Sequence, residues 1–533
     1  MEKKTFLVGA VILGIAGLMV QVLGAVFRIP LANIIGPAGM GYYQTAYPLY
    51  IFLLVFSTNG APAAISKMTS ERLAVGRIKD AHKVFKQAFG LMAVLGLMAF
   101  LGVFFGAESI VSAFGDPGAV LAMKAIAPAL LVVPIMSVYR GYFQGMQNMG
   151  PTATSQLVEQ GVRVAVGLSL AILWMKHGIE QAAAGATIGT SVGPLAGVLV
   201  LVLIYKKHRN KILASMEEDR NTSSESGKDI LRTLLWIALP ITVGVSILPI
   251  INLGDLFVLM KRLSVSGFTL EQANVLYGQL SGMVGPIINI PMALALSMAL
   301  ALVPAIASAK ASNDMTLLER NIQLGFRMAM IVGVPCSFGL IILAKPIMTL
   351  LYPLEMASAI NASGSLAYLA IGVIFLCIAQ TMAGTLQGLG KPGVAVVGLS
   401  IGFAVKLIAT YVLAGIPPLN MDGAAIASSM AYATIGLFNL WAVKNMTGII
   451  IDRPQSIYKP VLSGIIMFIT AGVVYRIFDG LIGNSLACLL AIFVAALVYG
   501  IVLLRIKGVR ENEIRRFPKG EKLASLLQKL KLL

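Results

Sequence analysis

The feature that most limits the fold of this chain is a series of fourteen apolar stretches spread over its whole length. Each has about 20 residues, enough for a helix to span a hydrocarbon core about 30 Å thick. The chain is 58% hydrophobic and only 12% charged, unlike soluble domains. We therefore predict an all-α polytopic membrane protein with fourteen transmembrane helices. They are expected at 5–27, 41–63, 84–106, 119–142, 152–175, 181–205, 233–256, 275–303, 323–344, 362–387, 393–415, 421–443, 459–477 and 483–504.

The positive charges predict the orientation of these helices. The chain has 41 lysines and arginines against 23 acidic residues. Most of the basic residues fall on one side of the predicted membrane, which favours an N-in, C-in topology because cytoplasmic segments are enriched in Lys and Arg. Lys124, Arg163 and Lys406 fall inside predicted helices. The net charge of +18 then indicates topology and attraction to anionic lipids, and no nucleic-acid partner is expected.

An internal repeat divides the chain into two halves. The motif GYFQG at 141–145 recurs as GTLQG at 384–388, and the same offset of 243 residues separates Arg163 from Lys406. Corresponding segments lie six predicted helices apart, an even number, so both copies have the same orientation and are related by an axis along the membrane normal. We predict two pseudo-symmetric six-helix lobes followed by a C-terminal helix pair.

These features give five predicted parts of the chain. The first and third are the lobes, the second is a polar cytoplasmic linker, the fourth is the terminal helix pair, and the last is a basic amphipathic helix at the inner leaflet. Their bounds are 1–206, 207–232, 233–444, 445–504 and 505–533.

Charged residues inside predicted helices are the first candidates for function. A charge at mid-bilayer opposes insertion by roughly 2.5 to 3.5 kcal/mol and usually faces a polar interior. Glu159 and Arg163 are four residues apart, which allows a local ion pair that can also do no more than neutralise itself. Lys406 has no acidic neighbour in its helix and is expected to face a hydrated central cavity, with a side chain reaching the membrane interface as the alternative. A cation in each half predicts an anion-accepting cavity.

Three further charged residues depend on where the helices end. If the first helix continues past Pro30 with a kink, Arg28 lies inside the membrane and can face the cavity; otherwise Arg28 is interfacial. Asp255 closes the predicted helix 233–256, and Arg262 follows shortly after it. Asp255 could pair with a cation, bind a coupling ion or be a solvated helix end.

No residue pattern predicts catalysis. The three cysteines lie in apolar stretches, and the three histidines are too far apart for metal-ligand spacing. The chain also lacks a phosphate-binding GxxxxGK[ST] loop. We expect a transporter without a cofactor, driven by an ion gradient of Na⁺ or H⁺, by the membrane potential or by the gradient of its substrate.

The N-terminal sequence carries a family resemblance. The stretches LGAVFRIPLANIIGPAGMGYYQTAYPLY at 23–50 and GAPAAISKMTSERLAVG at 60–76 resemble the MOP exporter superfamily. Within it the chain is similar to the polysaccharide-biosynthesis proteins of the stage V sporulation protein B and YtgP type. The resemblance implies a MurJ-like flippase whose lobes alternate between inward-open and outward-open states. It also implies that the last two helices build a groove for the lipid tail.

The resemblance also carries specific residues. Arg28 matches the family's cavity-facing arginine of the first helix, and Asp255 with Arg262 matches an acidic-then-basic pattern around helix seven. One departure concerns helix two at 41–63, which has no Lys or Arg where some relatives have an arginine. The cations of later helices are therefore expected to take part in holding a pyrophosphate.

The function implied is export of lipid II, the undecaprenyl-pyrophosphate-linked peptidoglycan precursor, across the bacterial cell membrane. The expected partners are this lipid, anionic lipids and cell-wall synthesis proteins. The alternatives are a flippase for another undecaprenyl-linked glycan of capsule or teichoic type, a MATE-type cation antiporter, and a non-transporting membrane scaffold. The intramembrane cations and the extra helix pair argue against the last two.

Overall fold

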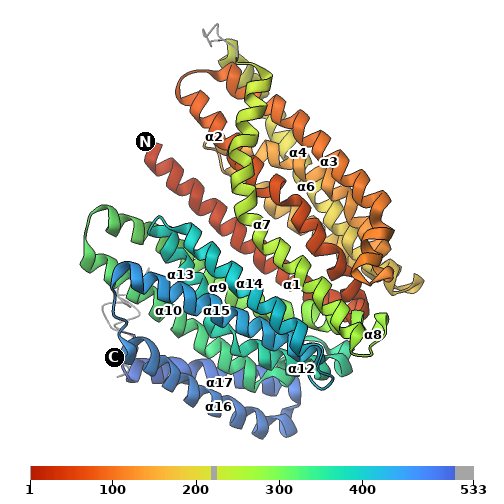
Figure 1. Cartoon of the computed structure of the whole chain (residues 1–533), viewed down its shortest axis with the longest axis vertical. Helices are drawn as coiled ribbons and strands as arrows, with labels where there is room; N and C mark the ends of the chain where they lie inside the picture. The colour runs from red at the N-terminus through yellow and green to blue at the C-terminus, as the bar shows by residue number, and fades with distance from the viewer. Residues whose placement is uncertain (1, 218–224, 510–533) are drawn as a thin grey trace. The chain divides into compact units, whose positions relative to one another are not determined.

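The chain folds into long helices joined by short turns (Figure 1). The computed structural model describes residues 2–217 and 225–509, and within those ranges no residue belongs to a β-strand. Contacts divide the chain into two compact units, Met1–Gly282 (unit 1) and Met283–Leu533 (unit 2).

Unit 1 is built around α4, which packs against both α3 and α6. Helix α5 covers α6, and α7 packs on α3. The side chains of α3, α4 and α7 form apolar clusters that include Met92, Ile126 and Leu234. The helices of unit 1 are α1 (Glu2–Val55), α2 (Ala61–Ala74), α3 (Ile78–Phe114), α4 (Val120–Gly145), α5 (Gly150–Trp174), α6 (Ile179–Glu217), α7 (Gly227–Val265) and α8 (Leu270–Tyr277).

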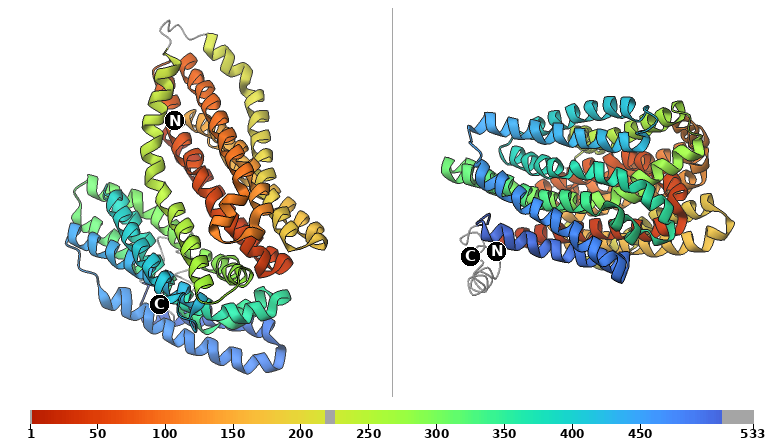
Figure 2. Two further views of the ribbon diagram at one scale, coloured as in Figure 1. Left: turned by 45° about the vertical axis from the view of Figure 1, so that its right-hand side comes forward. Right: turned by 90° about the horizontal axis from the view of Figure 1, so that it is seen from below.

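Unit 2 is organised around α13, which contacts α9, α10 and α15. The last two helices, α16 and α17, pack side by side and contact α10 and α11, respectively (Figure 2). The helices of unit 2 are α9 (Gly285–Ala311), α10 (Met315–Ile342), α11 (Ala344–Leu351), α12 (Met356–Ile371), α13 (Val373–Gly388), α14 (Pro392–Leu413), α15 (Asn420–Thr447), α16 (Lys459–Ile482) and α17 (Asn484–Arg505).

The number of membrane spans differs from the predicted fourteen. Within the described residues, twelve helices are long and apolar enough to cross a membrane, or thirteen if α12 and α13, bent by 43°, form one span. The predicted spans 5–27 and 41–63 both fall in the stretch from α1 to α2, where the helix changes direction without a loop. The difference therefore arises where a helix is broken rather than ended. The N-in, C-in orientation stays a prediction.

Helix α1 is broken at Gly36. This residue has φ 64° and ψ −178°, a conformation that glycine adopts at little cost and other residues rarely adopt. Pro30, by contrast, lies within continuous helix. Of the two alternatives for Arg28, the structure shows the one in which the helix continues past Pro30, with the break six residues later than expected.

The helices are longer than the predicted spans at several ends. Helix α6 continues to Glu217 and α7 begins at Gly227, so both extend into the predicted linker 207–232. The boundary between the two contact units, after Gly282, also differs from the predicted start of the second lobe at 233. The units are defined by contacts and the lobes by the sequence repeat, so the predicted lobes stay a prediction. Of the predicted amphipathic helix 505–533, residues from 510 onward lie outside the described residues.

Candidate functional site

Arg163 of α5 is held by aromatic side chains of α1. Its Nη2 donates a hydrogen bond of 2.7 Å to the Tyr43 hydroxyl, and its Nη1 lies 3.4 Å from the Tyr47 hydroxyl. The guanidinium carbon lies 5.2 Å from the centre of the Tyr47 ring and 6.0 Å from that of Phe27. Tyr43 is fully buried, and the Nε atom of Arg163 is buried without a hydrogen-bond partner. The aromatic residues thus fix the position of a membrane-embedded cation.

Arg28 joins the same cluster from α1 itself. Its guanidinium carbon lies 5.5 Å from the centre of the Tyr47 ring, so Tyr47 contacts both cations. Each such contact contributes roughly 0.5 to 2 kcal/mol, depending on solvation. Among residues 2–217 and 225–509, neither Arg28 nor Arg163 makes an ion pair with a carboxylate. The structure therefore brings together two of the predicted site residues.

The tyrosines are the part of the cluster that sequence reasoning missed. Tyr43, Tyr47 and Tyr50 are spaced by four and three residues, which places them on one face of a helix. The stacked Tyr43 and Tyr47 rings have centroids 5.8 Å apart, as do the tilted Tyr47 and Tyr50 rings. This helical spacing in GYYQTAYPLY was a readable signal.

Glu159 is paired differently from the prediction. Its Oε2 lies 2.7 Å from Nη2 of Arg140 on α4, and Nε of Arg140 donates a 2.9 Å hydrogen bond to Ser155. The expected local ion pair with Arg163 is therefore wrong. A spacing of four residues brings two side chains to one face, but the guanidinium of Arg163 is bound to α1 while the carboxylate of Glu159 reaches α4.

A row of glycines on α6 positions α5. A Cβ atom on Gly189 would lie 2.6 Å from the carbonyl oxygen of Arg163, and one on Gly193 would lie 2.7 Å from that of Glu159. Small residues allow the backbones of membrane helices to approach closely. The row also sets the position of α5 along α6, and with it the level along α5 at which Arg163 meets the tyrosines of α1. Its members are Gly185, Gly189, Gly193 and Gly197.

Asp255 and Arg262 lie on α7, which continues to Val265. The expectation that Asp255 closes its helix is therefore wrong, because the apolar sequence resumes after it at 256–260 and the helix continues with it. Asp255 and Arg262 are seven residues apart, so they lie on the same face of α7. Both are half-buried and both interact with other groups of the protein.

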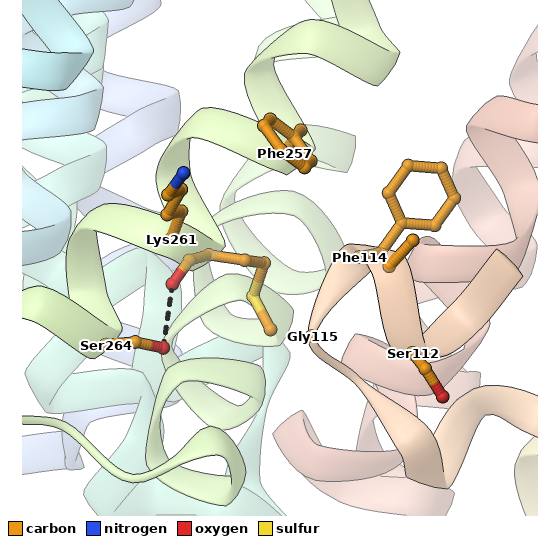
Figure 3. Close-up of a pocket in the computed structure, with 8 residues that line it drawn as sticks. Ser112, Phe114, Gly115, Phe257, Lys261 and Ser264 are labelled. Carbon is orange, nitrogen blue, oxygen red and sulfur yellow. Dashed lines mark hydrogen bonds between the residues drawn. The ribbon is translucent and has the colours of Figure 1, made fainter. Parts of the chain in front are cut away.

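A hollow of about 280 Å³ opens between the last turns of α3 and α7 (Figure 3). In this view Lys261 and Phe257 project from α7 and Phe114 lies across from them at the end of α3. The ammonium of Lys261 lies 5.8 Å from the centre of the Phe257 ring. The lining residues are Ser112, Ala113, Phe114, Gly115, Phe257, Met260, Lys261 and Ser264. None of the predicted site residues lines this hollow.

Lys406 lies on α14, in unit 2, and is half-buried. One turn before it, Gly402 packs closely on α15, because a Cβ atom there would lie 2.3 Å from Ile435. Lys406 also interacts with another group of the protein. Its convergence with Arg163, which belongs to unit 1, stays a prediction.

The cluster around Tyr47 has the chemistry of an anion site. Two guanidiniums without carboxylate partners can donate charge-assisted hydrogen bonds to an anion, and such bonds are roughly twice as strong as neutral ones. Within the described residues no group of three or more His, Cys, Asp or Glu side chains could hold a metal ion.

The fold is shared with solved membrane transporters. The structure of the lipid II flippase MurJ in an inward closed conformation matches with a TM-score of 0.68 and 17% identity, covering 92% of this chain and 98% of the other. An inward-facing multidrug resistance MATE family transporter of the MOP superfamily matches with a TM-score of 0.65 and 14% identity, covering 80% and 95%. At these identities the likeness shows a shared helical fold.

The sequence comparisons give the family. The polysaccharide biosynthesis protein profile matches residues 6–310, and the MatE profile matches residues 281–412. The lipid II flippase MurJ of Bacillus subtilis (strain 168) is 31% identical over 454 residues, covering 83% of this chain and 82% of the relative. Stage V sporulation protein B of the same organism is 29% identical over 524 residues, covering 97% and 98%. The chain belongs to the polysaccharide biosynthesis protein family.

This membership confirms the predicted class. The protein is a flippase of the MOP superfamily and not an enzyme. It is a multi-pass protein of the bacterial cytoplasmic membrane.

Proposed function

We propose that this flippase moves lipid II from the inner to the outer leaflet by alternating access. The observation that carries the proposal is the pair of guanidiniums, Arg28 and Arg163, that both contact the Tyr47 ring in membrane-spanning helices. A pyrophosphate loses its hydration when it enters a bilayer, and hydrogen bonds from guanidiniums can replace that hydration. The similarity to a lipid II flippase at 31% identity supports the same substrate.

The other predicted residues have subordinate roles in the proposal. Glu159 fixes α5 through Arg140 and so acts on the cation cluster as a positioning residue. Lys406 is a second contact for the head group, and Arg262 is a further candidate contact. Asp255 is the candidate site for a coupling ion, Na⁺ or H⁺. Anionic lipids and cell-wall synthesis proteins stay predicted partners.

A second candidate is a flippase for a different undecaprenyl-linked glycan. It is favoured by the similarity to a probable low-salt glycan biosynthesis flippase of Haloferax volcanii, which is 22% identical over 510 residues. Both substrates share the phosphate and the long tail, so the same cations would serve either. A cation antiporter of MATE type fits poorly, because the described cluster is cationic.

The test is a leaflet-accessibility assay for lipid II in cells depleted of their own flippase and supplied with this protein. We expect the protein to restore outer-leaflet lipid II, and Arg28→Ala and Arg163→Ala to abolish that recovery at unchanged protein abundance. Lys406→Ala tests the second contact independently. Rescue of another surface glycan without recovery of outer-leaflet lipid II would replace the proposal by the second candidate.

Lys124→Ala is the matched control. Lys124 is also a cation of a membrane-spanning helix, but its ammonium lies 2.8 Å from Glu108, whose side chain is 74% exposed. Its loss should leave export unchanged. Normal export by the Arg28 and Arg163 variants would show that these cations do not hold the head group.

A further inference from the structure

Glu225, which lies just before α7, is held by three cations. Its carboxylate Oε2 accepts a hydrogen bond from Arg72 of α2, and its Oε1 lies 3.1 Å from Nη1 of Arg77 in the turn before α3. The ammonium of Lys83 on α3 donates a hydrogen bond to the Glu225 carbonyl oxygen. Each carboxylate oxygen thus has its own guanidinium, an arrangement that also suits the oxygens of a phosphate.

Asp80 completes the base of this cradle. Its Oδ2 lies 2.8 Å from Nη2 of Arg77 and also accepts a 2.9 Å hydrogen bond from Nε. Its Oδ1 accepts a 3.1 Å hydrogen bond from the backbone N–H of Glu225. Asp80 is buried and orients Arg77. We call Arg72, Arg77, Lys83 and Asp80 the basic cradle.

The charges of the basic cradle favour an anion. Three cations face the single carboxylate of Asp80, which leaves a charge of about +2 when Glu225 is not counted. Arg72 is preorganised, since its side chain is only 11% exposed and its Nη1 donates a 2.9 Å hydrogen bond to the Met68 carbonyl. Its Nε is buried without a partner. Glu225 supplies one negative charge, so the site is only partly compensated.

We propose that the basic cradle is a binding site for a phosphate group carrying two negative charges, and that Glu225 occupies it as an internal competitor. Glu225 can leave without unwinding a helix, because α7 begins only at Gly227 with Ser226 as its cap. Partly exposed ion pairs are individually weak, so a dianion can displace a monoanion. The cradle lies at the predicted cytoplasmic ends of α2 and α3. The phosphate can belong to an inner-leaflet lipid or to a soluble compound, and the site does not rest on the export of lipid II.

The experiment is a calorimetric titration of inorganic pyrophosphate into the full chain in nanodiscs of neutral phosphatidylcholine. Glu225→Gln removes the competing charge and should raise the affinity about fivefold, the effect of one partly exposed ion pair. Arg77→Gln should lower it by at least the same factor. Unchanged affinity in both variants would overturn the proposal.

Glu71→Gln and Lys67→Gln are the matched controls. These residues form an exposed ion pair on α2, in which Nζ of Lys67 lies 3.8 Å from Oε1 of Glu71. Their side chains are 59% (Lys67) and 57% (Glu71) exposed. Each control makes the same charge change as its test variant, outside the cradle, and should leave pyrophosphate binding unchanged. Equal effects in test and control variants would show that pyrophosphate is attracted by the overall surface charge, and this result would refute the proposed binding site. If Glu225→Gln fails to fold, the comparison of Arg77→Gln with Lys67→Gln decides alone.

A second arm distinguishes the sources of the phosphate. The same titration is repeated in nanodiscs that contain phosphatidic acid, a lipid with a phosphomonoester. Loss of pyrophosphate binding there identifies a lipid head group as an occupant. Retained binding assigns the site to soluble phosphates.

Discussion

The turn between α3 and α4 contains a buried carboxylate whose protonation can be followed in solution. Asp116 is 2% exposed and accepts a 2.7 Å hydrogen bond from the hydroxyl of Thr45. Burial raises the pKa of Asp116 to about 6 from its ordinary value of 3.8, with a smaller contribution in the same direction from the charge of Glu180, while the Thr45 hydrogen bond acts against the rise. Replacing Asp116 by Asn should therefore change how stability depends on pH.

The sign follows from which state holds the proton. Because the folded chain binds the proton of Asp116 more tightly than the unfolded chain, the carboxyl favours folding below about pH 4, and this contribution is lost as the pH rises to about 6. A difference of about two pKa units corresponds to about 3 kcal/mol. The unfolding free energy of the wild type, compared with that of Asp116→Asn, should fall by up to this amount between pH 4 and pH 7.

The assay is thermal or denaturant unfolding of the purified chain in detergent, with both variants measured at each pH. Other titrating groups cancel in the comparison of wild type with Asp116→Asn. Thr45→Val removes a hydrogen bond that favours the ionised form, so it should move the transition to higher pH. Parallel pH profiles of wild type and Asp116→Asn would refute the reasoning.

Two further predictions concern the packing of α5. Gly189→Ala should destabilise the protein by about 1 to 3 kcal/mol, because the new methyl group meets the backbone of Arg163. The control Gly161→Ala should leave stability unchanged, because its methyl group meets nothing within 4 Å. Equal melting temperatures of the two variants would contradict the role given to the glycine row. Glu159→Gln should lower the unfolding free energy by about 1 to 3 kcal/mol, because it leaves the charge of Arg140, whose side chain is only 15% exposed, without its carboxylate partner. An unchanged melting temperature at low and high salt would show that this ion pair contributes nothing to stability.

The sequence was sufficient to predict the fold class, because apolar stretches long enough to span a bilayer must form helices that satisfy their own backbone hydrogen bonds. It could not locate the break at Gly36, since proline residues at 30 and 37 offered equally good positions for a change of direction. Helix ends were also missed. The predicted span 233–256 stopped next to Asp255, but α7 continues through the apolar residues 256–260 and the basic residues Lys261 and Arg262 to Val265.

The candidate site was predictable as a set of cations but not as an arrangement. Arg28 and Arg163 were identified from the cost of charge in a membrane, yet nothing in their spacing indicated that both contact Tyr47. The partner of Glu159 was missed because Arg140, nineteen residues earlier, lies on another helix. Contacts between helices depend on rotation about each helix axis, which hydropathy leaves undetermined.

The break at Gly36 separates Arg28 from Tyr47 along the chain. Arg28 precedes the break by eight residues, a lever of about 12 Å at the rise of an α-helix. A rotation of about 10° at Gly36 therefore displaces the backbone of Arg28 by about 2 Å, while the tyrosines beyond the joint keep their mutual spacing. Bending of α1 at Gly36 is thus enough to bring Arg28 closer to an anion bound near Tyr47 or to move Arg28 away from it.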